Sequence, residues 1–273
     1  MKPFSLCAIG NSHAATYHTA WKNAFARDLP HLTLTFFAAN GSDLEHLAFE
    51  DGAFVARDEK LAAQLALTSG GAQRIAIQDY DAFLLIGLGV RINIRRLIEG
   101  FGTVEHRRWG EVETLISRAC FTAMTQAVLN DNQAFRLLDR IRETGTQPAL
   151  VLPTPYRSDA EAGWTFLRKH RRLADSAFRA KLIAQVEEIG TALVRRYGAE
   201  ILWQDESTLG APGFSKAEYA QNPERLGSTA VDDGMHMNEA YGRIMLTRAL
   251  ARLDEMSGGR VLGTGEGRTL LRA

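Results

Sequence analysis

Residues 80–86, Tyr-Asp-Ala-Phe-Leu-Leu-Ile, constrain the fold more than any other stretch because they are almost continuously apolar. A strand that is apolar on both faces is typical of a parallel sheet covered by helices on both sides. Similar strands are predicted at about 4–9, 32–38, 149–152 and 199–203, and helical stretches separate them. This alternation predicts an α/β fold, a three-layer α/β/α sandwich around a parallel five-stranded sheet.

Helices are predicted from apolar residues that recur every three or four positions. Their approximate ranges are 14–26, 109–127, 132–143, 175–197 and 238–253. Residues 43–79 fit the alternation less well. They contain a stretch typical of a short strand at 54–56 and a helical stretch at 59–67, and we interpret them as an excursion beside the functional site. No linker or internal repeat divides the chain, so we expect one domain over residues 1–256 and a tail at 257–273.

Composition argues against several classes of protein. Lysine plus arginine and aspartate plus glutamate both number 32, so the formal net charge is zero, which argues against a broad nucleic-acid or anionic-membrane surface. Cys7 and Cys120 form neither a CxxC pair nor a zinc-like cluster, so no structural metal is expected. No stretch approaches the roughly 20 apolar residues of a membrane span, and the N-terminus lacks the pattern of a secretory signal. We therefore expect a cytoplasmic protein.

The first predicted strand ends in Gly10-Asn11-Ser12, a tight turn with a serine at its tip. In parallel α/β sheets ligands bind beyond the carboxyl ends of the strands. The helix that follows offers free N–H groups and partial positive charge to a developing anion. The same residues also suit an ordinary helix N-cap, in which Ser12 or Asn11 accepts a hydrogen bond from the helix backbone. The turn alone leaves both interpretations open.

A second feature, Asp-Gly-Met-His at 233–236, precedes the last predicted helix. A serine hydroxyl becomes a strong nucleophile only when a base accepts its proton and a third group orients that base. Because Asp233 and His236 are three residues apart in a predicted loop, their side chains can lie on the same side of a turn. A capped helix start explains the same residues equally well. Together with Ser12, the pair favours a catalytic interpretation.

These motifs resemble those of the SGNH (GDSL-type) hydrolases, a superfamily of esterases, lipases and carbohydrate deacetylases. The family's first block, Gly-Asp-Ser or Gly-Asn-Ser after the first strand, is similar to residues 10–12. Its second block, a glycine just after the second strand, is similar to Gly41 in the Asn-Gly-Ser turn at 40–42. Its last block, Asp-x-x-His before the final helix, is similar to residues 233–236. The resemblance therefore runs from one end of the chain to the other in order.

The resemblance implies a flavodoxin-like α/β/α fold and the mechanism of a serine hydrolase. In that mechanism Ser12 is the nucleophile, His236 is the base, and Asp233 orients the base. The backbone amides of Ser12 and Gly41 form part of an oxyanion hole. The mechanism needs no metal or organic cofactor.

The third block departs from the family pattern. The family has Gly-x-Asn-Asp after the third strand, and the asparagine side chain donates to the oxyanion, but this chain has Gly-Leu-Gly-Val-Arg at 87–91. The asparagine position holds Gly89 or Arg91, depending on which glycine is aligned. Loss of one oxyanion donor costs about 2.7–4 kcal/mol, or roughly 10²–10³ in rate. Three interpretations are open: Arg91 supplies a charged donor, Asn93 or a residue of the excursion fills the gap, or Arg91 is an ordinary surface residue and the protein is catalytically weak.

Other polar residues fall where substrate contacts are expected. His13 adjoins the nucleophile and either contacts substrate or simply begins the helix. Asp232 lacks the spacing to His236 that Asp233 has. The basic cluster at 169–172 is interpreted as a solvated helix end. Four residues after the fourth and fifth strands suit either substrate contact or ordinary loop polarity; they are Tyr156, Arg157, Asp205 and Glu206.

The sequence thus predicts an esterase that hydrolyses a small acyl ester of a carbohydrate or other polar alcohol through an acyl-enzyme on Ser12. The resemblance favours an acetyl group. The alternatives are an inactive relative that binds a glycan or polar ligand, and an acyltransferase that uses the same three residues. The expected partner is the small-molecule or carbohydrate ester, with no nucleic acid and no membrane.

Overall fold

The computed structural model describes residues 3–41, 43–90, 101–109, 112–159, 171–221 and 233–263, and only the backbone of Arg171, Arg172 and Asp233. Its centre is a five-stranded sheet in which all paired strands are parallel. In order across the sheet the strands are β10 (Glu200–Ile201), β9 (Ala149–Pro153), β6 (Ala82–Gly87), β1 (Phe4–Gly10) and β2 (Leu32–Ala38). This is the flavodoxin-like strand order, so the predicted fold class is confirmed.

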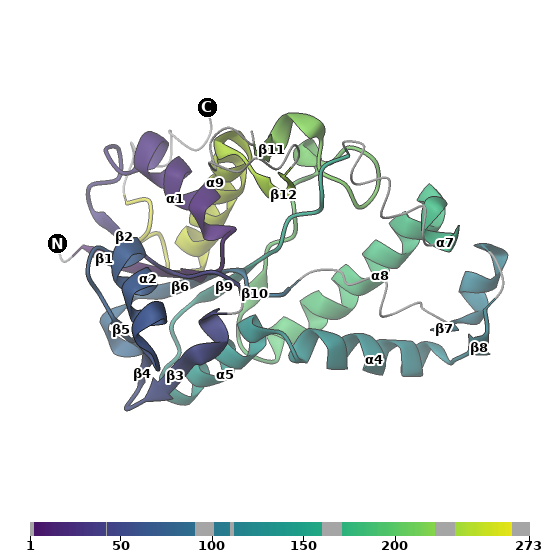
Figure 1. The fold of residues 1–273 in the computed structure, drawn as a ribbon, viewed down its shortest axis with the longest axis horizontal. Helices are drawn as coiled ribbons and strands as arrows, with labels where there is room; N and C mark the ends of the chain where they lie inside the picture. The colour runs from purple at the N-terminus through teal and green to yellow at the C-terminus, as the bar shows by residue number, and fades with distance from the viewer. Residues whose placement is uncertain are drawn as a thin grey trace.

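Helices cover both faces of the sheet (Figure 1). They are α1 (Ala14–Ala20), α2 (Glu59–Ser69), α5 (Gln133–Thr144), α8 (Ser176–Arg195) and α9 (Glu239–Met256). A single π-helical turn, Trp21–Phe25, continues α1. Within the described part of the chain, none of the helices combines the length and apolar character needed to cross a membrane.

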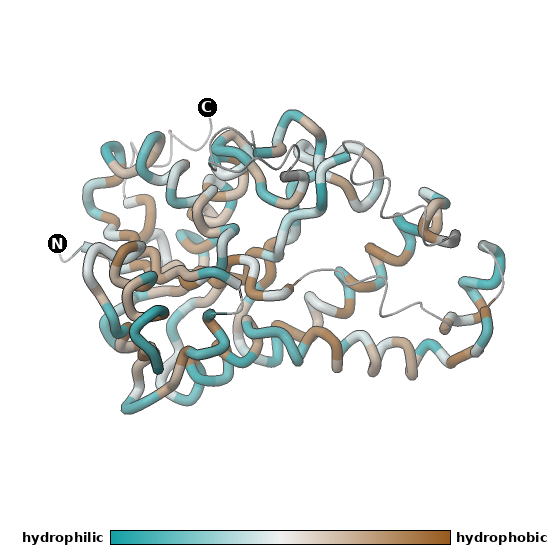
Figure 2. Tube along the Cα trace, viewed as in Figure 1, coloured by the Kyte–Doolittle hydropathy of each residue, from teal (hydrophilic) through white to brown (hydrophobic). Residues whose placement is uncertain are grey.

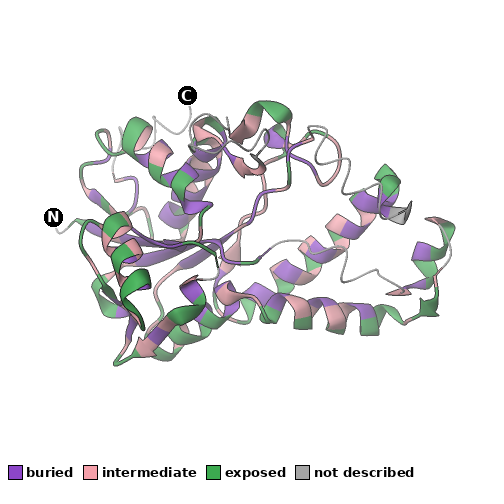
Figure 3. Cartoon of the chain, viewed as in Figure 1, coloured by how far each residue is buried: buried purple, intermediate pink, exposed green. Residues whose placement is uncertain are grey.

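Alternate residues of β1 pack into two separate cores because neighbouring side chains of a strand point to opposite faces. Leu6 and Ala8 belong to the core beneath α1 and α9. Cys7 and Ile9 belong to the core formed with α2, α5 and the C-terminal end of α8. Figure 3 shows the resulting burial of the central strands between the two helical layers. The three layers therefore hold the carboxyl ends of the strands at one common edge.

Residues 43–79 form a small antiparallel sheet that packs with α2. The sheet contains β3 (Leu47–Glu50), β4 (Ala53–Ala56) and β5 (Arg74–Ala76). The strand predicted at 54–56 and the helix predicted at 59–67 are confirmed, whereas β3 was not predicted. Asp51 and Gly52 join β3 to β4 with φ values of 46° and 70°, as in a type I′ hairpin turn.

A helical arm extends beyond the edge of the sheet. We define it as α4 (Arg118–Asn130), the neighbouring part of α8, and the short α7 (Arg171–Ala174), β7 (Phe101–Gly102) and β8 (Thr114–Leu115) at its far end (Figure 1). Apolar residues lie along both long helices (Figure 2). A separate core, which includes Phe121, Phe178 and Leu182, holds these helices together.

The helix predicted at 109–127 begins nine residues later than expected. The helix α4 begins at Arg118 because the Ser117 side chain caps it by accepting a hydrogen bond from the Cys120 N–H at 3.1 Å. The residues before the cap are a tight helical turn at Val104–Trp109 and the strand β8.

The described part of the C-terminal tail packs on the domain. Val261 and Leu262 are buried, and both of their backbone amides donate to Oδ1 of Asp254, at 3.0 and 2.9 Å. Residues 257–263 therefore contribute to the core beneath α9.

Replacing Gly242 by valine should lower the free energy of unfolding by about 1–3 kcal/mol. A Cβ at Gly242 would lie 2.6 Å from the carbonyl oxygen of Thr16, so α1 and α9 would have to separate. Urea denaturation would measure the change. Ala240→Val is the control, because Ala240 is exposed on the same helix. Equal losses in the two variants would contradict the close packing of α1 on α9.

Candidate active site

Ser12 and His236 meet at the carboxyl edge of the sheet, although 224 residues separate them. The Oγ of Ser12 lies 2.8 Å from Nε2 of His236. Ser12 is exposed in the turn between β1 and α1, and His236 is half-buried in β12 (Asp233–Met237). The turn lies beside β6, where the strand order reverses and ligands bind in folds of this topology. The structure therefore brings the predicted nucleophile and base together.

The turn before α1 has almost no space for other side chains. A Cβ at Gly10 would lie 2.9 Å from the Cβ of Ala14 and 3.0 Å from the carbonyl oxygen of Ile86. The N–H of Asn11 donates to that same oxygen at 3.3 Å, and its Oδ1 accepts from the N–H of His13 at 3.2 Å. The Asn11 side chain, not that of Ser12, therefore accepts a hydrogen bond from the backbone of the turn. The N-cap interpretation of Ser12 was wrong, and its hydroxyl is available to His236.

Hydrogen bonds on both sides fix the backbone that carries His236. Thr16 Oγ1 of α1 donates to the carbonyl of Met237 at 2.6 Å, and this bond is buried. Asn238 caps α9, because its Oδ1 accepts from the Tyr241 N–H at 3.2 Å. Its Nδ2 donates to the Glu218 carbonyl at 2.7 Å. The sequence did not identify Thr16, because nothing in its position sets it apart from the other polar residues of α1.

The Asp-x-x-His block was predicted as a loop, but the structure places it in β12. This strand pairs with β11 (Ala220–Gln221). Ala220 faces Met237 and Gln221 faces Asp233, so adjacent residues of β11 oppose residues four apart in β12. The extra residues form a bulge, which breaks the regular alternation of a strand. His236 lies within this bulge. The side chain of Asp233 and all of Asp232 lie outside the described structure, so the orienting role of Asp233 stays a prediction.

His13 packs against His236 instead of facing solvent. Its side chain is buried, and its ring centroid lies 4.8 Å from that of His236 with the rings tilted by 33°. The sequence left open whether His13 contacts substrate or begins the helix. In the structure it immediately precedes α1 and lies against the ring of His236.

The turn that contains Gly41 runs beside the turn that carries Ser12. The Ala39 N–H donates to the Gly10 carbonyl at 3.2 Å, so the turn after β2 runs beside the turn that carries Ser12. Gly41 is exposed in this turn. It follows Ala39 by two residues, just as Ser12 follows Gly10 by two residues. Among the described residues, neither the Ser12 N–H nor the Gly41 N–H has a hydrogen-bond acceptor. Both amides can therefore bind an anion.

The turn after β6 holds three successive residues in the left-handed region. The φ values are 74° at Gly87, 51° at Leu88 and 79° at Gly89. For Leu88 this conformation costs about 1–3 kcal/mol, and strain of this kind is common beside functional sites. A Cβ at Gly89 would lie 2.9 Å from Oδ1 of Asn132, so a side chain at position 89 would have to displace that of Asn132. Arg91 and Asn93 lie outside the described residues, so their roles stay predictions.

The remaining predicted contact residues join the loops that follow β9 and β10. Gln204 Oε1 accepts from the Tyr156 N–H at 2.9 Å. The Tyr156 hydroxyl donates to Glu187 at 3.1 Å, and burial raises the pKa of both groups. Asp205 forms an ion pair with Arg248 at 3.2 Å, which gives it a structural role.

Arg157 and Glu206 complete the set of predicted contact residues. Arg157 accepts a hydrogen bond at its carbonyl from the Ser215 N–H at 2.8 Å, and Glu206 is exposed. The structure does not describe the side chains of the predicted basic cluster at 169–172.

The chemistry that this geometry allows is nucleophilic attack by a hydroxyl. An imidazole nitrogen 2.8 Å from a serine oxygen can accept its proton as the oxygen attacks an electrophile. The backbone amides of Ser12 and Gly41 have no acceptor among the described residues, and backbone amides of this kind can stabilise an oxyanion. Within the described residues, no group of three or more His, Cys, Asp or Glu side chains is placed to hold a metal ion.

Comparisons with known proteins find similarity of structure only. No family model and no curated protein sequence matches the chain. An extracellular lipase from Streptomyces rimosus is 13% identical over 90% of this chain and 99% of that chain, with a TM-score of 0.46. A family two carbohydrate esterase from Clostridium thermocellum is 12% identical over 95% of this chain and 66% of that chain, with a TM-score of 0.40.

A lipopolysaccharide acetyltransferase periplasmic domain from Salmonella ser. Paratyphi A is 11% identical over 92% of this chain and 83% of that chain, with a TM-score of 0.41. Lipase, carbohydrate esterase and acetyltransferase domains are thus among the solved structures that this chain resembles. At such identities and TM-scores, the fold assignment rests on the chain's own sheet topology and the site on its own geometry.

Replacing Thr16 by valine should lower the free energy of unfolding by about 1–3 kcal/mol, because the buried carbonyl of Met237 would lose its donor. Thr19→Val is the matched control, since the Thr19 hydroxyl makes only an exposed bond to the Ala15 carbonyl of its own helix. Urea denaturation of both variants would measure the difference. Similar unfolding free energies would show that the bond to Met237 does not hold β12 against α1.

Proposed function

We propose that this protein is a serine esterase that hydrolyses a small acyl ester of a polar alcohol. The observation that carries the proposal is the 2.8 Å contact between Ser12 Oγ and His236 Nε2. It lies at the strand edge where this topology binds ligands, next to two backbone amides without acceptors among the described residues. The acetyl group and the carbohydrate alcohol follow from the family resemblance.

In the proposed mechanism, Nε2 of His236 accepts the proton of Ser12 as its oxygen attacks the ester carbonyl. The tetrahedral intermediate collapses when the imidazolium gives that proton to the leaving alcohol. Water then attacks the acyl-enzyme, again with His236 as the base, and Ser12 is regenerated. Because Nε2 must be unprotonated at the start, Nδ1 carries the proton, and we propose that Asp233 accepts a hydrogen bond from it.

The amides of Ser12 and Gly41 would stabilise the oxyanion. Gly89 contributes no side chain, so a third donor must come from elsewhere, and Arg91 is the candidate within the same block. Without a third donor, we expect the rate to be roughly 10²–10³ below that of an enzyme with a complete oxyanion hole.

A ligand-binding protein without catalysis is the second candidate, and the observation that favours it is that Gly89 supplies no side-chain donor to an oxyanion. Such a protein would bind a polyol or glycan saturably in the Ser12→Ala variant as well as in the wild type. It would hydrolyse no ester. An acyltransferase would use the same residues and differ in the alcohol that accepts the acyl group.

Turnover of p-nitrophenyl acetate tests the proposal. Ser12→Ala and His236→Gln should each lower kcat by roughly 10⁴-fold or more, because each removes one member of the proton-transfer pair. Ser207→Ala, at an exposed serine on another loop, is the control. Circular dichroism would verify that all variants fold. Activity that survives in folded Ser12→Ala would rule out the mechanism.

The role of Asp233 can be tested by comparing a substitution there with the same substitution at Asp232. Asp233→Asn should lower kcat by roughly 10³–10⁴, since an asparagine favours the wrong tautomer of the base. Asp232→Asn changes the charge equally one residue away and should have little effect. Kinetics with p-nitrophenyl acetate would compare the two. A larger loss in Asp232→Asn would transfer the orienting role to that residue.

A further inference from the structure

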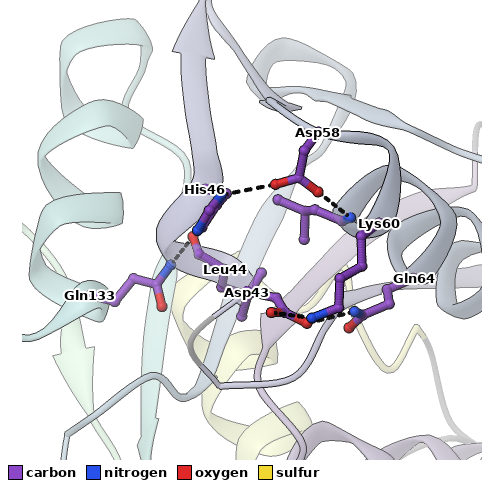
Figure 4. Close-up of polar contacts among 8 residues, drawn as sticks. Asp43, Leu44, His46, Asp58, Lys60, Gln64 and Gln133 are labelled. Carbon is purple, nitrogen blue, oxygen red and sulfur yellow. Dashed lines mark hydrogen bonds and ion pairs between the residues drawn. The ribbon is translucent and has the colours of Figure 1, made fainter.

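One side chain of α2 bridges the two sides of Gly41. Gln64 Oε1 accepts from the Asn40 N–H at 2.9 Å, and Gln64 Nε2 donates to Oδ2 of Asp43 at 2.6 Å. Figure 4 shows the amide of Gln64 turned toward Asp43. The residues on either side of the predicted oxyanion donor are therefore joined through a single carboxamide.

Two neighbours on the same face of α2 hold the same segment. Lys60 Nζ lies 2.8 Å from Oδ1 of Asp43, and this pairing lowers the pKa of the carboxyl and raises that of the ammonium. Thr68 Oγ1 lies 3.1 Å from the N–H and 2.9 Å from the carbonyl of Ala38. Lys60, Gln64 and Thr68 are four residues apart, which places them in one row on a helix.

The helix that carries this row is itself firmly placed. Leu61 and Leu65 are buried in the core beneath the sheet. Asp58 caps the helix by accepting from the Leu61 N–H at 2.8 Å, and its other oxygen pairs with His46 Nδ1 at 2.9 Å (Figure 4). Gln133 of α5 donates to the Leu44 carbonyl at 2.5 Å, which ties the chain after the turn to the next helix.

The turn at Gly41 has no comparable support from packing. Gly41 is exposed, and among the described residues other than its chain neighbours no atom lies within 4 Å of where its Cβ would be. Within the turn, the Asp43 N–H donates to the Asn40 carbonyl at 3.0 Å. The Asn40 carbonyl belongs to the same peptide unit as the Gly41 N–H, so this bond holds that unit, and Gln64 in turn holds both residues that make the bond.

We propose that Gln64 is a positioning residue of the esterase site, which aims the Gly41 N–H at the oxyanion; this inference rests on the proposed function. Donors that are fixed before the reaction stabilise a developing charge without the cost of reorganisation. A displacement of about 1 Å in such a group can cost roughly 10²-fold in rate. Gln64 touches neither substrate nor the reacting atoms, so its effect passes through Gly41.

Glutamine suits this position because it accepts and donates at the same time. Glutamate at position 64 would still accept from Asn40 but would repel Asp43 while both carboxylates are ionised. At lower pH the two carboxyl groups can share a proton, which restores a donor to Asp43. Among the described residues, Lys60, His46 and Asp58 are the other charged or titratable groups that form ion pairs near this pair.

Steady-state kinetics with p-nitrophenyl acetate test the inference. Gln64→Ala should lower kcat about tenfold, less than the roughly 10²–10³ that loss of a whole oxyanion donor costs, with KM changed less than about twofold. The kcat of Gln64→Glu should also be about tenfold lower than that of wild type at pH 8, and the ratio of the two kcat values should rise toward pH 5. Gln73→Ala is the matched control, because Gln73 is exposed in the loop after α2.

The outcomes separate this inference from the proposed function. Wild-type turnover that depends on Ser12 but is unchanged in Gln64→Ala overturns the positioning role alone. A loss of kcat that a lowered melting temperature fully explains also overturns the positioning role. The same holds if the kcat of Gln64→Glu relative to wild type does not change with pH. Absence of Ser12-dependent turnover in the wild type overturns the proposed function, and the positioning role with it.

Discussion

The hydrogen bond between Ser12 and His236 exists only because the first and last elements of the chain pack closely. Ser12 enters the site from β1, and His236 enters from β12, just before α9. The two helices that follow these residues approach so closely at Gly242 that no side chain fits there. Thr16 adds a buried bond from α1 to the strand that carries the base. The distance between the reacting groups is therefore a property of the whole fold.

The sheet supplies the rest of the site through its order. The turns after β1, β2 and β6 meet at one edge because these strands are parallel neighbours. Their backbones differ in what holds them. The turn after β6 is fixed by left-handed glycines and the buried Leu88, whereas the exposed turn at Gly41 depends on side chains of α2. The excursion at 43–79, which interrupts the α/β alternation, is the part of the chain that provides this support.

The sequence was most informative where chemistry is local. Continuous apolar residues indicate the buried strands. The Gly-Asn-Ser and Asp-x-x-His blocks singled out Ser12 and His236, which the structure brings within hydrogen-bond distance. The strand β3 was missed although the Asp51-Gly52 dipeptide is a hairpin signal, and the start of α4 was misplaced because Ser117 was not recognised as its cap. The bond from Asn40 to Gln64 spans 24 residues and follows from no local pattern, because only the packing of α2 brings the two together.

Reaction with a fluorophosphonate probe tests the central claim most directly, since it reports an activated serine without knowledge of the substrate. Intact mass followed by peptide mapping would locate the adduct. We expect a single adduct on Ser12, none in Ser12→Ala, and much slower labelling in His236→Gln. Folded wild-type protein that forms no adduct, or forms one on another residue, would contradict the assignment of Ser12 and His236 as a nucleophile and its base.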